Sequence, residues 1–170
     1  MKQFKLLAPL IILLVGFNLA AFSQETLPPV TVESVNYKYI RSVYDHDAAQ
    51  PVKLLQHKAA TYDVKESDYY EDEFEGYSIS FHLPNGQVLA TYDKDGKLLR
   101  TAERYKNIAL PAVVRKSVAE KYPNWGFTKD TYVVNYYADD KPSKVYKMVL
   151  ENGSKRIRIK TNEAGELIEK

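Results

Sequence analysis

A short pattern of turn and strand residues occurs twice in this 170-residue chain, and it constrains the fold more than any other feature. Residues 83–99 contain Asn-Gly, an alternating run and Asp-Gly, whereas residues 150–168 contain Asn-Gly, a similar run and Ala-Gly. Asn-Gly favours a hairpin because both residues tolerate positive φ. The pattern therefore predicts two regions of antiparallel hairpins.

A stretch that predicts a helix precedes each hairpin region. Both stretches open with a proline, which suits the first turn of a helix, and have a tyrosine eleven positions later, giving helices over 51–62 and 111–122. In the first, Val52, Leu55 and Ala59 recur at helical spacing and predict one buried stripe. The helix starts are 60 residues apart and the Asn-Gly turns 67 apart, so we favour a duplicated unit. Independent origin of two common turns is the alternative.

Alternation of apolar and polar residues predicts the strands. The expected strands cover residues 31–44, 77–83, 87–93, 97–104, 132–136, 146–150, 156–160 and 166–169. Residues 63–76 form an acidic connector whose strand layout the sequence does not define. Asp93 to Gly96 resembles the start of a calcium loop, but position twelve is Arg104 rather than a glutamate, which indicates a plain turn. Together the elements predict an α+β fold, a tandem repeat of a helix packed on an antiparallel sheet whose other face is partly open.

The first residues predict a cleaved export signal. Two lysines precede an apolar run over 6–22, and the small residues that end at Ser23 fit cleavage after that residue. A retained membrane anchor is the alternative, although the run of about 17 residues is shorter than the ~20 that span a bilayer. We therefore expect residues 1–23 to be a signal peptide and the product to be periplasmic or secreted. Residues 24–105 and 106–170 would form the two repeats of one continuous domain.

Composition limits the partners. The chain has no cysteine, so we expect neither disulfides nor a lipid-modified cysteine after cleavage. Without the leader it holds 22 basic and 22 acidic residues. A net charge of zero makes a poor general binder of nucleic acid or anionic membranes, whose contacts need an excess of Lys and Arg. We therefore expect no nucleic-acid partner and no membrane contact after signal cleavage.

Four short segments resemble the secreted PepSY-like family, which is described as resembling the β-lactamase inhibitor protein. They are residues 92–99, 121–125, 132–137 and 146–153. The resemblance implies a tandem helix-plus-antiparallel-sheet fold with helices on one side and a broad exposed sheet on the other. It also implies an origin in Bacteroidetes-type bacteria and a protein partner, because relatives with the inhibitor fold use the open sheet to grip an enzyme. The family brings no catalytic residue with it.

The three histidines are expected on the surface rather than at a metal site. His46 lies between two aspartates, but adjacent residues seldom converge on one metal ion. His57 is expected to share the polar face of its helix with Lys53 and Gln56, and His82 to point outward from a strand.

Nucleophilic catalysis needs a serine or cysteine in contact with a base. Ser80 and His82 share one face of a predicted strand, but neighbours two positions apart lie roughly 6.5–7 Å from each other, too far for direct contact. The chain also lacks Gly-rich phosphate-binding motifs. We therefore expect no catalytic residue, no metal and no cofactor.

The last predicted hairpin carries the best candidate surface. If Ile157 and Ile159 face a helix, the basic residues that alternate with them face solvent, and a lysine of the preceding strand joins them. The candidate protein-binding residues are Lys147, Arg156, Arg158, Lys160 and His82. The competing interpretation is that alternating charges only keep an open sheet soluble.

We therefore expect an exported, noncatalytic binding module. Its open sheet face would contact an unknown protein partner in the cell envelope or outside the cell, which it would inhibit or regulate. The alternative is a periplasmic protein that binds a small ligand or a metal ion, between sheet and helix or at the acidic connector. An enzyme is the third possibility, but the sequence shows no converging polar groups.

Overall fold

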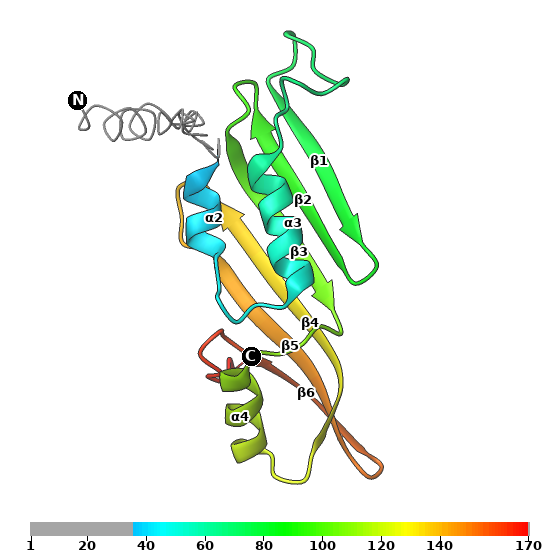
Figure 1. Ribbon diagram of the computed structural model, residues 1–170. Helices are drawn as coiled ribbons and strands as arrows, with labels where there is room; N and C mark the ends of the chain where they lie inside the picture. The colour runs from blue at the N-terminus through cyan, green and yellow to red at the C-terminus, as the bar shows by residue number, and fades with distance from the viewer. Residues whose placement is uncertain (1–35, 170) are drawn as a thin grey trace, which may run out of the picture. The chain divides into compact units, whose positions relative to one another are not determined.

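The computed structural model describes residues 36–169, which form one six-stranded antiparallel sheet and three helices (Figure 1). In chain order the elements are α2 (Tyr37–Val43), α3 (Gln50–Thr61), β1 (Gly76–Leu83), β2 (Gly86–Asp93), β3 (Leu98–Lys106), α4 (Ala112–Lys121), β4 (Gly126–Tyr137), β5 (Ser143–Asn152) and β6 (Lys155–Thr161). This arrangement confirms the expected α+β class. The predicted signal peptide, residues 1–23, lies outside the described residues. Within the described part, no helix combines the length and apolarity needed to cross a bilayer.

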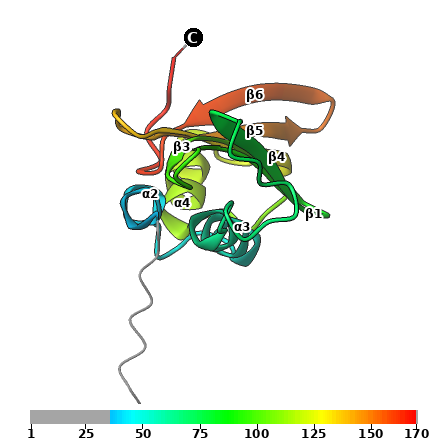
Figure 2. The same ribbon diagram turned by 90° about the horizontal axis from the view of Figure 1, so that it is seen from above.

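Each strand pairs with the next one in the chain, so the sheet is a meander from β1 to β6. The helices lie on the same face of this sheet (Figure 2). α3 packs on β1, β2 and β3, while α2 lies against α3 and β4. α4 lies at the other end of that face, where the Ser117 hydroxyl donates to the carbonyl of Gly165 at 2.6 Å. The described residues leave the opposite face of the sheet uncovered.

The order helix, strand, strand, strand occurs twice, as α3 with β1–β3 and as α4 with β4–β6. The two Asn-Gly dipeptides lie at different positions in that order, the first between the first and second strands of its group and the second between the second and third strands. The first joins β1 to β2, where Gly86 already pairs with Leu83. The second joins β5 to β6, where Gly153 has a φ of +57°. The matching turns therefore lend a duplication no support, and duplication stays a prediction.

Packing rather than backbone geometry requires the glycine at position 86. A Cβ atom there would lie 2.7 Å from Cδ1 of Tyr105 and 3.1 Å from Cδ1 of Leu55. Because carbon atoms in contact are normally about 3.5–4.0 Å apart, a side chain at this position would push α3 and β3 away from β2. Gly86 thus sets how closely α3 approaches the sheet.

The strand predicted over 31–44 is wrong for its described part, because Tyr37–Val43 form helix α2. Tyr39 and Val43, four positions apart, are both buried, which is the spacing of one helical face. Tyr37, which strand alternation would place beside Tyr39, is 62% exposed. The ring of Tyr39 packs edge-on against Tyr136 with centroids 5.0 Å apart. This packing overrides the strand preference of tyrosine and valine.

The short strand predicted over 166–169 is also wrong, since only a single bridge joins Thr161 to Leu167. Residues 63–75, the acidic connector, form turns without a strand. The remaining predicted strands and both predicted helices are present, and their bounds lie within three residues of the expected ones except for β4, which begins at Gly126 rather than at residue 132.

Aromatic side chains fill much of the core between the helices and the sheet. The fully buried tyrosines are Tyr39, Tyr92, Tyr105, Tyr132, Tyr136 and Tyr146. The rings of Tyr132 and Tyr146 stack with centroids 4.2 Å apart. Met148 and Leu150 are buried on the same side of β5 as Tyr146, and Ile157 and Ile159 pack against this core from β6, on the side expected for them.

Candidate functional site

The open face of the sheet is predominantly basic from β3 to β6. Every second residue of these strands points away from the helices, which places Arg104 and Lys106 of β3 on this face. The register extends it, because Lys106 pairs with Thr131, Thr131 with Lys147, and Lys147 with Lys160. We define the basic face by its exposed cationic residues Arg100, Arg104, Lys106, Lys129, Lys147, Arg156, Arg158 and Lys160.

Within β3 to β6, only Glu151 places a carboxylate on this face. It accepts a hydrogen bond from Nε of Arg156 at 2.6 Å and forms an ion pair with the same guanidinium. Among the described residues, no carboxylate lies within 4.0 Å of the nitrogen atoms of the other seven cations. Like charges gathered on one surface create a positive potential that attracts anionic groups, most strongly at low ionic strength.

The structure brings three of the candidate binding residues close together. Lys147 and Lys160 are cross-strand neighbours, and Arg158 lies two positions before Lys160 on the same face. Arg156 is exposed on this face too, but the ion pair described above already compensates its charge. His82 shares the open face but lies on β1, at the edge of the sheet opposite β6, and is not brought to the others. A binding role stays a prediction for all five.

Half of the basic face was not predicted from the sequence. The missed residues are Arg100, Arg104, Lys106 and Lys129. A usable signal was present, because Arg100 and Arg104 are separated by an even number of positions in the strand predicted over 97–104 and so lie on the same face of it. That strand extends to Lys106 in the structure, which adds one more cation to the same face.

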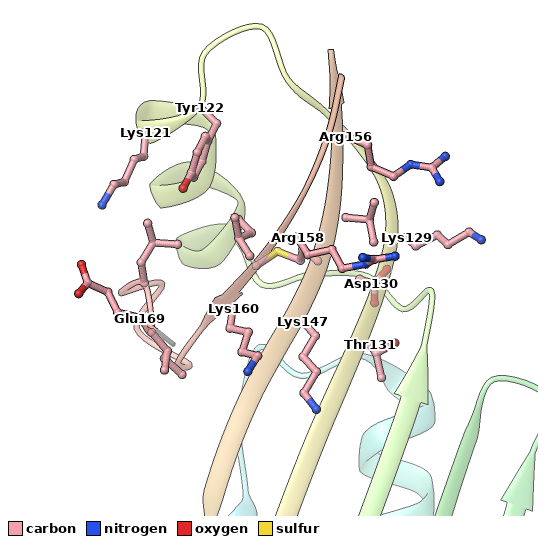
Figure 3. Close-up of a pocket in the computed structure, with 15 residues that line it drawn as sticks. Lys121, Tyr122, Lys129, Asp130, Thr131, Lys147, Arg156, Arg158, Lys160 and Glu169 are labelled. Carbon is pink, nitrogen blue, oxygen red and sulfur yellow. The ribbon is translucent and has the colours of Figure 1, made fainter. Parts of the chain in front are cut away.

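Space of about 820 Å³ lies at the end of the sheet near α4, and residues of both sheet faces line it. Figure 3 shows Arg156 on one side of β5 and β6, with Lys121 and Tyr122 on the other. The space therefore consists of two surfaces separated by the sheet rather than one enclosed cavity. On the helix side, the apolar part of the lining includes Tyr122, Ile159 and Leu167, and the charged residues Lys121 and Glu169 lie beside it (Figure 3).

Glu103 is a buried carboxylate that lies on the helix side of β3 and is 2% exposed. Its Oε1 accepts hydrogen bonds from the hydroxyls of Tyr39 (2.7 Å) and Thr101 (2.8 Å). Its Oε2 accepts from Nε2 of Gln56 (2.9 Å) and from the hydroxyl of Tyr105 (2.8 Å). Burial raises the pKa of Glu103, and the four hydrogen bonds oppose the rise because they favour the charged form. This cluster joins α2 and α3 to the sheet, and its place in the core makes it structural.

The expected polar face of α3 needs one correction, because the side chain of Gln56 is buried and bonded to Glu103. Sequence periodicity had grouped it with Lys53 and His57. All three histidines are exposed, and Nδ1 of His46 lies 3.1 Å from a carboxylate oxygen of Asp47. Within residues 36–169, no three His, Cys, Asp or Glu side chains come together as metal ligands.

Comparison with known proteins adds little to this geometry. No family model matches the chain, and no curated protein matches it. Among solved structures, it is similar to a BLIP-like protein from Bacteroides fragilis, with 21% identity and a TM-score of 0.34. The match covers 58% of this chain and 69% of that one. A TM-score this low does not establish a shared fold, so the resemblance to the PepSY-like family stays a prediction.

Proposed function

We propose that this chain is an exported, noncatalytic protein-binding module whose basic face binds an acidic surface of a partner protein and thereby inhibits or regulates it. The observation that carries the proposal is the imbalance of that face, with eight cationic side chains and one carboxylate on four adjacent strands. Charges that served solubility alone would carry both signs interspersed, because mixed surfaces are soluble without a strong local potential. Selection for an anionic partner accounts for the single sign.

Apolar side chains between the cations favour a protein over a nucleic acid as that partner. Val133 and Val145 are cross-strand neighbours in the middle of the face, and Val149 lies opposite Arg158. These valines are half-buried, and Tyr137 at the end of β4 is 54% exposed. Protein interfaces combine an apolar centre with charges that steer association, whereas binding to a phosphate backbone rests mainly on the cations.

Reversing the charges of Lys147 and Arg158 together tests the proposal. Both side chains are exposed and form no ion pair with the described residues, so the double variant Lys147→Glu/Arg158→Glu should keep its fold. The partner would first be captured from an envelope extract or culture fluid by the immobilised native chain, then purified for titration. We expect the double variant to bind it on the order of ten- to a hundredfold more weakly, with a smaller dependence on salt.

The matched control is the double variant Lys94→Glu/Arg115→Glu, which reverses two charges outside the basic face. Lys94 lies in the turn between β2 and β3, and Arg115 lies on α4. This control changes the net charge by the same amount but leaves the basic face intact. Equal affinity of the two double variants would reject the basic face as the contact. If the chain instead carried a small ligand or a metal ion, its thermal unfolding would shift with the concentration of that ligand, and charge reversal would leave partner binding unchanged.

A further inference from the structure

The outer edge of β6 presents backbone groups that β5 does not use. β6 is the last strand of the sheet, and its outer edge is covered only at its end, where Ile168 donates its N–H to the carbonyl of Lys160 at 2.9 Å. In an antiparallel ladder, residues whose backbone groups bond to the neighbour alternate with residues whose groups point away. The N–H and C=O groups of Arg156 and Arg158 therefore point outward as well. No backbone group of the described residues pairs with them there.

The two sides of this edge differ in chemistry. Three cations of the basic face project from β6 to the open side and are exposed. Ile157 and Ile159 project to the helix side and are half-buried against the core. Tyr122 and Leu167 extend this apolar strip beside Ile159. A strand added at the edge would thus meet positive charge with one set of alternate side chains and an apolar surface with the other.

We propose that the β6 edge binds an extended segment of the partner, in which acidic and apolar residues alternate, by adding it to the sheet as a further strand. This inference rests on the proposed function, since the same cations select the acidic residues. A second copy of this chain does not fit, because two paired β6 edges would place Arg and Lys side chains opposite one another, and like charges in that position destabilise a sheet. An acidic segment turns this repulsion into attraction.

Two substitutions at Arg158 separate strand addition from attraction between charges. Arg158→Ala removes the charge and keeps the outward N–H. Arg158→Pro removes the N–H as well, and since that group lies outside the ladder with β5, an edge strand tolerates the proline. The probe is a short fluorescent peptide that alternates Glu and Val, and its control is a block-ordered isomer of the same composition.

Binding is measured by fluorescence anisotropy. We expect saturable binding of the alternating peptide to the native chain and weaker binding to the Arg158→Ala variant. The Arg158→Pro variant should bind a further two- to tenfold more weakly, roughly the effect of one lost backbone hydrogen bond. The block-ordered isomer should bind less well than the alternating peptide, because it cannot place charge and apolar groups on opposite sides of the edge.

The folding of the Arg158→Pro variant is checked by comparing its thermal unfolding transition with that of Arg158→Ala. If the proline variant is unfolded, a second measurement replaces it. Methylating every second amide nitrogen of the alternating peptide removes the donors that a strand would use, and the native chain should then bind it at least several-fold more weakly.

Strand addition is overturned by equal affinity for the methylated and unmethylated peptides, by equal affinity of folded Arg158→Pro and Arg158→Ala, or by no saturable binding. Each of these results leaves the proposed function standing. That proposal fails separately, when reversal of Lys147 and Arg158 does not affect partner binding.

Discussion

Removing the hydroxyl of Tyr39 should destabilise the fold although the residue lies on the other side of the sheet from the basic face. This hydroxyl is one of four donors to the buried carboxylate of Glu103, at 2.7 Å from Oε1. The substitution Tyr39→Phe keeps the ring, which packs on Tyr136, so it creates no large cavity. It leaves Oε1 with the hydroxyl of Thr101 as its remaining donor. The carboxylate cannot recruit bulk water at 2% exposure, and the loss is therefore not recovered.

Hydrogen bonds to charged groups contribute about 1.5–3 kcal/mol, so we expect Tyr39→Phe to lower the free energy of unfolding by about 2 kcal/mol. A domain of this size has an unfolding free energy of roughly 5–15 kcal/mol, so the change is a large fraction of the total. With a urea m-value of about 1–3 kcal/mol per molar, the midpoint should fall by about 1 M at unchanged m.

Urea titration followed by circular dichroism measures this change at pH 7. Tyr37→Phe is the matched control, because Tyr37 lies on the same helix, is 62% exposed and makes no hydrogen bond to the described residues through its hydroxyl. It should alter the unfolding free energy by less than about 0.5 kcal/mol. A Tyr39→Phe loss no larger than that of Tyr37→Phe would refute the view that the Glu103 cluster holds α2 on the sheet.

Three further predictions concern pH, packing and a buried hydroxyl. Because the pKa of Glu103 is raised on folding, the folded state binds a proton at this carboxylate more tightly than the unfolded state does. The stability of the native chain relative to Glu103→Gln should therefore be greatest below pH ~4.5 and fall as pH rises through the folded-state pKa; a stability difference that stays constant with pH in urea titrations contradicts this. Gly86→Ala should lower the free energy of unfolding by about 1–3 kcal/mol, because its Cβ would clash with Tyr105. Gly126→Ala is the control and should be tolerated, because its Cβ would have its nearest neighbour at 3.8 Å; equal decreases in the melting temperatures of the two variants would contradict this account. Tyr146→Phe should leave the free energy of unfolding unchanged or raise it by up to about 1 kcal/mol, because the buried hydroxyl of Tyr146 has no hydrogen-bond partner among the described residues. A decrease of more than about 1 kcal/mol in urea titrations would show that this hydroxyl is hydrogen-bonded in the native chain.

The sequence predicted the elements whose side-chain period is unambiguous. Residues 156–160 of β6 alternate charged and apolar side chains, and in β5 Tyr146, Met148 and Leu150 recur at every second position; the structure has these apolar residues on the helix side of the sheet. α3 and α4 begin next to prolines and carry a regular apolar stripe. In these elements the local preference and the tertiary packing agree, so a single chain contains enough information.

Other features of the structure depend on long-range contacts, which no local sequence pattern indicates. Tyr37 to Val43 fit a strand as well as a helix, and the interaction of Tyr39 with Glu103 decides between them. Gln56 was expected on the polar face of its helix, yet it is buried and donates a hydrogen bond to the buried carboxylate of Glu103. The basic face was found only where it coincided with the last hairpin, since its full extent follows from the register between β3 and β4.

The meander order has a consequence for how the chain reaches its native state. Every strand pairs with its neighbour in sequence, and every connection except the one through α4 is a short loop, so the sheet can grow stepwise at a low entropic cost. α2 is the exception, because Lys38 bonds to the carbonyl of Ala138, 100 residues later in the chain. A seven-residue helix is not stable alone, so α2 can form only after β4 is in place. During synthesis the first described element should therefore be among the last to fold, and Glu103 stays without one of its donors until then.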